Sequence, residues 1–232
     1  RLPDRHLRRT GGLGAYSRMI KLIASDLDGT LIGPDFRFRP RTLHALQAAR
    51  AAGIQIVFVT GRPSRWLTPI REQTDFDSYA ICSNGAVIYH LGADEVEAVN
   101  GAPAHAIRSA HELLQPVFPN ATYTLETVDT VYIQGPYEGG EVLEGARVVE
   151  QHLLGALDGF AGEQVIKYLV HVPGMDPDIL QARVAQTVGE LVSVTRGVVG
   201  EPLIEMGSKT VNKGYTLAQF AARHGIEAHE VM

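Results

Sequence analysis

The feature that most constrains the fold lies in residues 21–85, where short apolar runs alternate with helix-like segments. Each apolar run is bounded by Asp, Gly or Asn, and each helix-like segment begins at a proline. This alternation is typical of a parallel sheet whose strands are joined by right-handed crossovers. It predicts strands at 21–25, 54–59 and 79–83, and helices at 40–52 and 63–73.

The middle of the chain has a different pattern and predicts an α+β insert, a small open sheet covered by helices. The expected helices are 104–115, 141–157 and 177–191, and the expected strands are 122–125, 130–134, 165–172 and 192–195. The α/β pattern then returns in a helix that starts at Asn212, and residues 230–232 look like the first step into another strand. The predicted fold class is therefore α/β. A Rossmann-like parallel-sheet core spans 19–86 and 206–232, and an α+β cap domain is inserted over 87–205.

Residues 1–18 contain five arginines and show no hydrophobic period. Met19 directly precedes the first apolar run, so we expect translation to start there and residues 1–18 to be a disordered, non-native leader. An Arg-rich transit peptide is the alternative, although Asp4 and the missing amphipathic stripe count against it.

Charge and cysteine content narrow the class of function. The formal net charge of −5 disfavours nucleic acid as the main partner, because phosphate backbones select basic faces. Cys82 is the only cysteine, so it forms no internal disulfide and fits a reducing compartment, and a cytoplasmic location is expected. No run of about 18 apolar residues predicts a membrane span.

The strongest chemical signal is residues 26–31 (DLDGTL), directly after the first predicted strand. Ligands of open parallel sheets bind beyond the carboxyl ends of the strands, so Asp26 and Asp28 can face one site. A simple turn or helix start is the alternative, because Asp is common there. An EF-hand loop does not fit, since it needs Gly at its sixth position and this segment has Gly at its fourth.

Residues 26–31 resemble the first motif of the haloacid dehalogenase superfamily of phosphotransferases. Residues 57–62 (VFVTGR) are similar to the second motif, an apolar strand that ends in Ser or Thr. Residues 212–214 (NKG) are similar to the third, a Lys at a helix start. Residues 83–86 (SNGA) and the long insert resemble the Cof-type hydrolases with a type IIB cap, which are sugar-phosphate phosphatases. The resemblance implies that Asn84 lies at the hinge into the cap; a plain turn is the alternative.

The residue types suit phosphoryl transfer. The Asp26 carboxylate can attack phosphorus and form an acyl phosphate, and Asp28 can protonate the leaving alcohol and later deprotonate water. Charge on the transferred group needs surrounding donors and cations. The expected phosphate-binding groups are the Thr60 hydroxyl, the Leu27 and Gly61 backbone N–H groups, and the Lys213 ammonium at a helix N-terminus.

Each of these side chains also has a purely structural interpretation. Thr60 can simply pack in a strand, and Lys213 can be a solvated surface lysine. Arg62 can hold an anionic substrate, or it can pair with a nearby acid.

In the haloacid dehalogenase superfamily, which these motifs resemble, a fourth motif, Gly-Asp-x-x-x-Asp, holds Mg²⁺ together with the Asp of the first motif. No segment up to Met232 matches it, and Asp26 with the Asp28 carbonyl would hold Mg²⁺ weakly. We therefore expect the natural chain to continue past Met232 into that motif.

The predicted function is Mg²⁺-dependent hydrolysis of a small phosphate monoester, such as a sugar phosphate, through an aspartyl phosphate. The partner is then a small phosphorylated metabolite, with no nucleic acid and no membrane; the oligomeric state is not predicted. The alternatives are a sugar phosphomutase and a non-catalytic phosphometabolite-binding protein.

Overall fold

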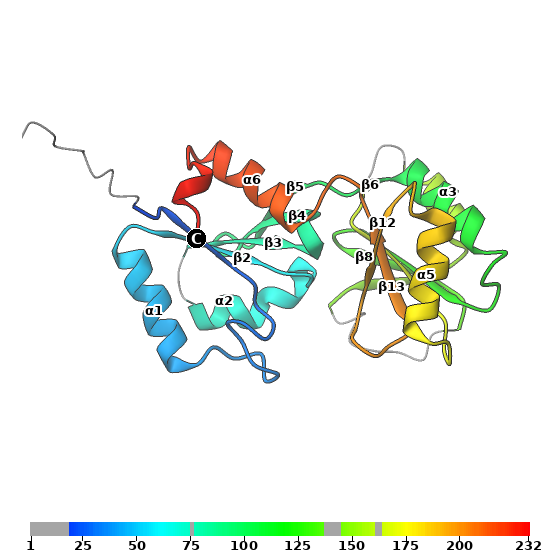
Figure 1. Cartoon of the computed structure of the whole chain (residues 1–232), viewed down its shortest axis with the longest axis horizontal. Coiled ribbons are helices and arrows are strands. Elements are labelled where there is room, and N and C mark those ends of the chain that lie inside the picture. Colours follow the sequence, from blue (N-terminus) through cyan, green and yellow to red (C-terminus); the bar gives the residue numbers. More distant parts are fainter. Residues whose placement is uncertain (1–18, 75–76, 137–144, 161–163) are drawn as a thin grey trace, which may run out of the picture.

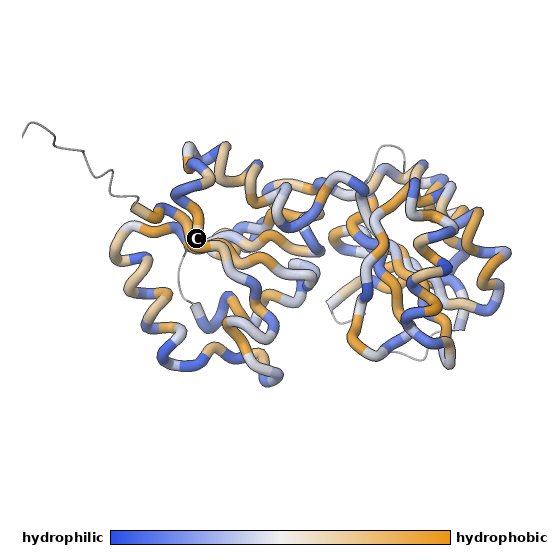
Figure 2. Tube along the Cα trace, in the orientation of Figure 1, coloured by the Kyte–Doolittle hydropathy of each residue, from blue (hydrophilic) through white to orange (hydrophobic). Residues whose placement is uncertain are grey.

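The computed structural model describes residues 19–74, 77–136, 145–160 and 164–232. The leader predicted at 1–18 lies outside these residues. The chain forms two sheet-based units that lie side by side, and apolar residues concentrate along the strands of both (Figures 1 and 2).

The first sheet has the strand order β1-β2-β3-β4-β5. Its strands are β1 (Leu22–Ser25), β2 (Gln55–Val59), β3 (Tyr79–Cys82), β4 (Val87–His90) and β5 (Glu95–Val99). The first three pair in parallel, as the alternation predicts, and β4 and β5 continue the sheet antiparallel. The predicted α/β class with a parallel core is therefore confirmed.

Helices cover both faces of this sheet (Figure 1). The helices are α1 (Pro40–Ala51), α2 (Thr68–Thr74) and α6 (Lys213–Arg223), with short 3-10 turns η1 (Ser64–Leu67), η2 (Ser83–Gly85) and η4 (Ala228–Glu230). Leu46 of α1 and Ile70 of α2 pack with Phe58 on one face, whereas Phe220 of α6 packs with Val57 on the other. The adjacent residues Val57 and Phe58 of β2 thus pack into the cores on opposite faces of the sheet, because side chains alternate along a strand.

The last residues of the chain lie beside β1. Leu22 forms a parallel bridge with Val231, and Met232 exchanges backbone hydrogen bonds with Leu22 and Ala24 at 2.9 and 2.7 Å. The strand-like start expected at 230–232 is confirmed for Val231 and Met232, whereas Glu230 ends the 3-10 turn η4. This pairing places β1 between β2 and the terminal residues.

The second sheet has the order β12-β13-β11-β7-β8-β9. Its strands are β7 (Thr122–Glu126), β8 (Thr130–Gln134), β9 (Arg147–Glu150), β11 (Lys167–His171), β12 (Ser193–Arg196) and β13 (Leu203–Gly207). Helices α3 (Ala104–Leu114), α4 (Leu153–Asp158) and α5 (Pro177–Val188) pack on one face around a shared apolar core. A short ribbon of β6 (Ala102–Pro103) and β10 (Gln164–Val165) stands apart from both sheets.

Two sequence expectations differ from the structure. The insert was expected to begin at residue 87, but β4 and β5 hydrogen bond into the first sheet, and β13 belongs wholly to the second. We therefore propose that the inserted cap unit runs from about residue 100 to about residue 207. The helix expected over 141–157 is wrong at Arg147–Glu150, which forms β9 in parallel with β8. Val148 and Val149 lie opposite Val131 and Tyr132, and this cross-strand packing outweighs local helix propensity. Residues 141–144 lie outside the described residues.

Within the described residues, no helix is both long enough and apolar enough to cross a membrane.

A histidine is buried in the core of the cap unit. His111 on α3 is fully buried, its Nδ1 lies 2.7 Å from the Tyr168 hydroxyl, and its ring meets the Tyr123 ring edge-on at 4.8 Å. Burial disfavours the charged imidazolium and lowers the pKa of His111 to about 4. The folded cap therefore holds this histidine neutral.

This burial predicts a loss of stability in mild acid. Between pH 6.5 and about 4 the unfolded chain binds a proton at His111 that the folded chain does not, so the free energy of unfolding falls as the pH falls through this window. The loss is about 2 kcal/mol after allowance for residual solvation. Urea unfolding of the parent and of His111→Gln from pH 7.5 to 4.5 measures it, with His105→Gln, an exposed position on the same helix, as the control. Equal pH dependence in parent and His111→Gln would contradict the assignment.

Candidate active site

Two aspartates lie at the carboxyl end of β1. The chain turns sharply there because the Leu27 carbonyl accepts hydrogen bonds from the N–H groups of Thr30, Leu31 and Ile32 at 3.0–3.2 Å. Gly29 has a φ of +69°, a left-handed conformation that glycine adopts without strain. The Leu27 side chain is buried, whereas the Asp26 and Asp28 side chains are 45% and 49% exposed. The turn thus buries the residue between the two acids and leaves both carboxylates at the edge of the sheet.

Thr60 and Gly61 directly follow the neighbouring strand β2. Thr60 is fully buried, its backbone N–H donates to Ile81 O at 2.8 Å, and its hydroxyl accepts from the Arg62 N–H at 3.1 Å. Gly61 lies close to Asn84, whose Oδ1 would be 3.1 Å from a Cβ added at residue 61. A side chain at position 61 would press on this neighbour, so a substitution there would push the Asn84 side chain aside.

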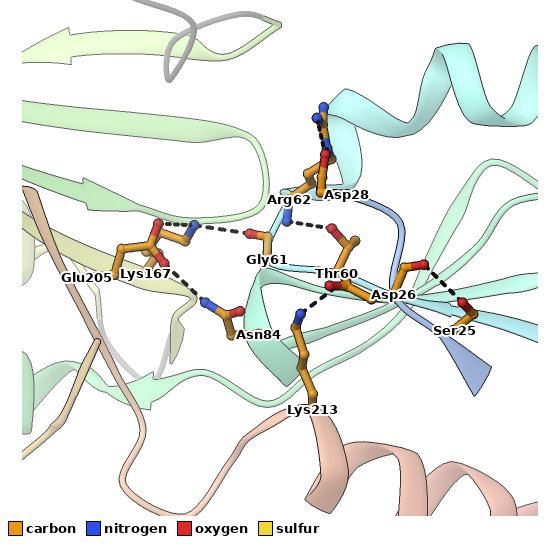
Figure 3. A network of polar contacts seen from close by, with 10 residues as sticks. All are labelled: Ser25, Asp26, Asp28, Thr60, Gly61, Arg62, Asn84, Lys167, Glu205 and Lys213. Carbon is orange, nitrogen blue, oxygen red and sulfur yellow. Dashed lines mark hydrogen bonds and ion pairs between the residues drawn. The ribbon is translucent and has the colours of Figure 1, made fainter. Parts of the chain in front are cut away.

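Lys213 reaches the same place from the far end of the chain (Figure 3). It is the first residue of α6, whose N-cap Asn212 accepts a hydrogen bond from the Tyr215 N–H at 2.9 Å. The Lys213 ammonium lies 3.2 Å from Asp26 Oδ1. The structure therefore brings Asp26, Thr60 and Lys213 together from three separate segments, as the motifs predict.

Arg62 pairs with an acid of the site itself. Its guanidinium holds the Asp28 carboxylate through Nε at 2.9 Å and Nη2 at 2.6 Å. The guanidinium also lies over the Phe36 ring, 4.1 Å from the centroid, and 5.9 Å from that of Trp66. Of the two sequence interpretations, pairing with an acid is the one seen here, and the pairing fixes the orientation of Asp28.

Asn84 lies in the turn between β3 and β4, and its side chain faces the cap. Ser83 and Asn84 have φ values of +48° and +56°, and Gly85 has +112°. A Cβ at Gly85 would lie 2.6 Å from the Asn212 backbone, so glycine allows the turn to pack against the start of α6. The Asn84 side chain donates to Glu205 Oε2 of the cap at 3.1 Å. Asn84 therefore contacts the cap through its side chain, but the hinge expected at this position is wrong, because the strands on either side of the turn, β3 and β4, both belong to the first sheet.

Sequence reasoning missed two cap residues, Lys167 on β11 and Glu205 on β13. The Lys167 ammonium lies 2.9 Å from Glu205 Oε1 and donates to Gly61 O at 3.1 Å. A further contact between the units, Arg65 to Glu126 at 3.1 Å, is nearly buried. A charged residue alternating with apolar ones in a strand usually indicates a solvated face, so the sequence carries no signal for these contacts.

The donor set of the site suits a hard cation to a limited extent. Among the described residues, no three His, Cys, Asp or Glu side chains cluster as metal ligands. The site still offers exposed oxygens at Asp26 and Asp28, and Mg²⁺ is commonly held by one or two carboxylates together with substrate phosphate and water. These residues therefore fit an Mg²⁺ ion that completes its coordination with water and substrate.

Comparison with known proteins agrees with the geometry. Residues 23–232 match the sequence model of the haloacid dehalogenase-like hydrolases. The chain is 33% identical to the pyridoxal phosphate phosphatase YbhA of Escherichia coli over 113 residues, which is 49% of this chain and 40% of that protein. It is 24% identical over 217 residues to the 5-amino-6-(5-phospho-D-ribitylamino)uracil phosphatase YitU of Bacillus subtilis, covering 91% of this chain and 78% of that one.

A solved structure shares the fold over nearly the whole chain. BT4131, described as a HAD subclass IIB sugar phosphatase, superposes with a TM-score of 0.68 at 19% identity, covering 91% of this chain and 79% of that one. The family match takes in the three motif-bearing segments and the insert between them, which confirms the resemblance drawn from the sequence and the expected hydrolase class. The chain therefore belongs to the haloacid dehalogenase-like hydrolase family.

Proposed function

We propose that this protein is a phosphatase that hydrolyses a small phosphate monoester through an aspartyl phosphate on Asp26. The observation that carries the proposal is the convergence of Asp26, Asp28, Thr60 and Lys213 at one edge of the first sheet, with the Lys213 ammonium 3.2 Å from the Asp26 carboxylate. An ammonium beside a carboxylate neutralises charge that would otherwise repel an incoming phosphate.

The reaction has two steps. The Asp26 carboxylate oxygen attacks phosphorus, the bond from phosphorus to the leaving oxygen breaks, and Asp28 gives its proton to that oxygen. Asp28 then takes a proton from water, and the water oxygen attacks phosphorus and releases Asp26 and inorganic phosphate. Thr60, Lys213 and the Leu27 and Gly61 backbone N–H groups are assigned to the oxygens of the transferred group.

Magnesium is the proposed cofactor, held by Asp26 and Asp28. When bound, it supplies positive charge that offsets the repulsion between the carboxylate and the phosphate. The residues of the chain then orient the phosphate and move the proton.

The proposed substrate is a small phosphorylated metabolite such as a sugar phosphate. A pocket of about 540 Å³ is lined in part by Phe36, Arg62, Arg65 and Trp66, and Arg62 also holds the Asp28 carboxylate. Aromatic rings and guanidinium groups suit the flat face of a sugar or of a heteroaromatic ring. The named activities of YbhA and YitU, on pyridoxal phosphate and a phosphorylated ribitylaminouracil, agree with this class.

Chelation tests the cofactor and the reaction together. Phosphate release from a panel of sugar phosphates and pyridoxal phosphate should require Mg²⁺, fall by about tenfold or more in EDTA, and return when Mg²⁺ is added in excess. A circular dichroism spectrum unchanged by EDTA serves as the control for folding. Full activity in EDTA would contradict the magnesium proposal alone.

The same substrates separate the alternative functions. Transfer of phosphate between two hydroxyls of a sugar without phosphate release would identify a mutase, and binding without turnover would identify a non-catalytic protein.

A further inference from the structure

Four segments meet in a closed ring of hydrogen bonds between cap and core, and Figure 3 shows the side-chain contacts of this ring. Lys167 Nζ donates to Gly61 O and to Glu205 Oε1, at 3.1 and 2.9 Å. Glu205 Oε2 accepts from Asn84 Nδ2 at 3.1 Å, and the Asn84 N–H donates to Thr60 O at 3.1 Å. The ring therefore begins and ends on the loop that carries the proposed phosphate-binding groups.

The contact at Gly61 acts on a single peptide group. The Gly61 carbonyl and the Arg62 N–H belong to the same planar unit, so fixing the direction of one fixes the direction of the other. Lys167 holds the carbonyl, and the Arg62 N–H on the opposite side donates to the Thr60 hydroxyl at 3.1 Å. A cap lysine is thus joined to the Thr60 hydroxyl through one peptide bond.

This link determines what the Thr60 hydroxyl can do. A hydroxyl has one hydrogen to donate and two lone pairs that accept. With one lone pair occupied by the Arg62 N–H, the hydroxyl remains free to donate its hydrogen to a bound anion. If the peptide turned away, the fully buried hydroxyl would lose this partner and its fixed orientation.

The acid beside Lys167 keeps this arrangement charged. The Lys167 and Glu205 side chains are only 9% and 15% exposed. An ammonium this buried is costly unless it is paired, and the Glu205 carboxylate supplies the opposite charge. Charge-assisted hydrogen bonds are also stronger than neutral ones, which favours a rigid ring.

We propose that Lys167 is a positioning residue for phosphate binding, acting through the Gly61–Arg62 peptide on the Thr60 hydroxyl, so that the cap completes the phosphate site of the core. The inference rests on the proposed function, because it assigns a phosphate to Thr60. It adds a residue of the inserted unit that does not itself touch the substrate.

A double-mutant cycle tests whether Lys167 acts through Thr60. Lys167→Met removes the ammonium and keeps the aliphatic stem, and Thr60→Val removes the hydroxyl and keeps the shape. Binding of inorganic phosphate is followed by the fluorescence of Trp66, the only tryptophan, which lies beside Arg62. Each single change should weaken phosphate binding by about tenfold. The double variant should bind about as weakly as either single one, because both changes break the same link. Losses that multiply to about a hundredfold would overturn the proposal.

Two further variants test whether Lys167 acts by positioning the phosphate site or only through the net charge or the stability of the cap. Lys167→Arg keeps a donor for Gly61 O and should recover most of the binding. Arg108→Met also removes one cation from the cap, but Arg108 pairs with Asp158 on the helical face and should leave phosphate binding unchanged. Equal losses in Lys167→Met and Arg108→Met would overturn the proposal. If Lys167→Met does not fold, Glu205→Gln, which frees Lys167 from its acid, takes its place in the cycle with the same expectation.

Measurements on the parent protein separate a failure of the proposed function from a failure of the role proposed for Lys167. A parent that neither binds phosphate nor hydrolyses a phosphate ester overturns the proposed function and this inference together. A parent that hydrolyses the ester, with a cycle whose losses multiply, overturns the role of Lys167 alone.

Discussion

Asp26→Asn is expected to lower kcat for hydrolysis of a phosphate monoester by about a thousandfold or more. The amide has the same shape as the carboxylate but lacks the charge that attacks phosphorus. Lys213, 3.2 Å from Asp26 Oδ1, would remain in place to bind the phosphate. The loss should therefore appear in kcat more than in KM. Steady-state phosphate release, with the melting temperature measured in parallel, checks the expectation.

A matched control and a trapping experiment sharpen this result. Asp158→Asn changes another exposed aspartate that has an arginine partner, on the helical side of the cap, and should leave kcat unchanged. Beryllium fluoride added to the parent should place the phosphoryl mimic on Asp26, seen by crystallography. Appreciable activity in Asp26→Asn would rule out the covalent mechanism.

Asp28→Asn is expected to lower hydrolysis of an alkyl phosphate by about a hundredfold or more, because Asp28 supplies the proton to a poor leaving group and later accepts one from water. An aryl phosphate has a good leaving group that needs little protonation. With that substrate, phosphorylation of Asp26 should persist while release of inorganic phosphate lags. Rapid-quench measurement of the burst and of the steady state separates the two steps.

The Arg62 contact provides the control for this second variant. Arg62 holds the Asp28 carboxylate through two nitrogens, and an amide at position 28 keeps one acceptor for that guanidinium. The position of residue 28 should therefore change little, which a crystal structure of the variant can verify. If Asp28→Asn hydrolyses an alkyl phosphate as fast as the parent, Asp28 has no part in proton transfer.

Local signals in the sequence were enough to predict how the site assembles. A buried strand followed by Asp26 and Asp28, a second strand followed by Thr60, and Lys213 at a capped helix start are all patterns of a few residues. Parallel strands bring their carboxyl ends to one edge of the sheet, so predicting the strands also predicts that these residues meet. A strand-like start was predicted at residues 230–232 from the same kind of local pattern, and within it Val231 pairs with Leu22.

Contacts between distant surfaces could not be predicted in this way. Nothing near Arg62 in the sequence selects Asp28 as its partner. Lys167 and Glu205 have no local pattern that marks them, and they contact Gly61 and Asn84 only because the cap sheet packs against the core. Likewise β4 and β5 joined the first sheet, and Arg147–Glu150 formed a strand, because cross-strand pairing outweighs local propensity. The sequence by itself determined which residues stand at the edge of the core sheet, since that follows from local periodicity and turn chemistry. Only the tertiary structure decided which charges of the cap meet that edge, because their approach depends on how the two sheets pack against each other.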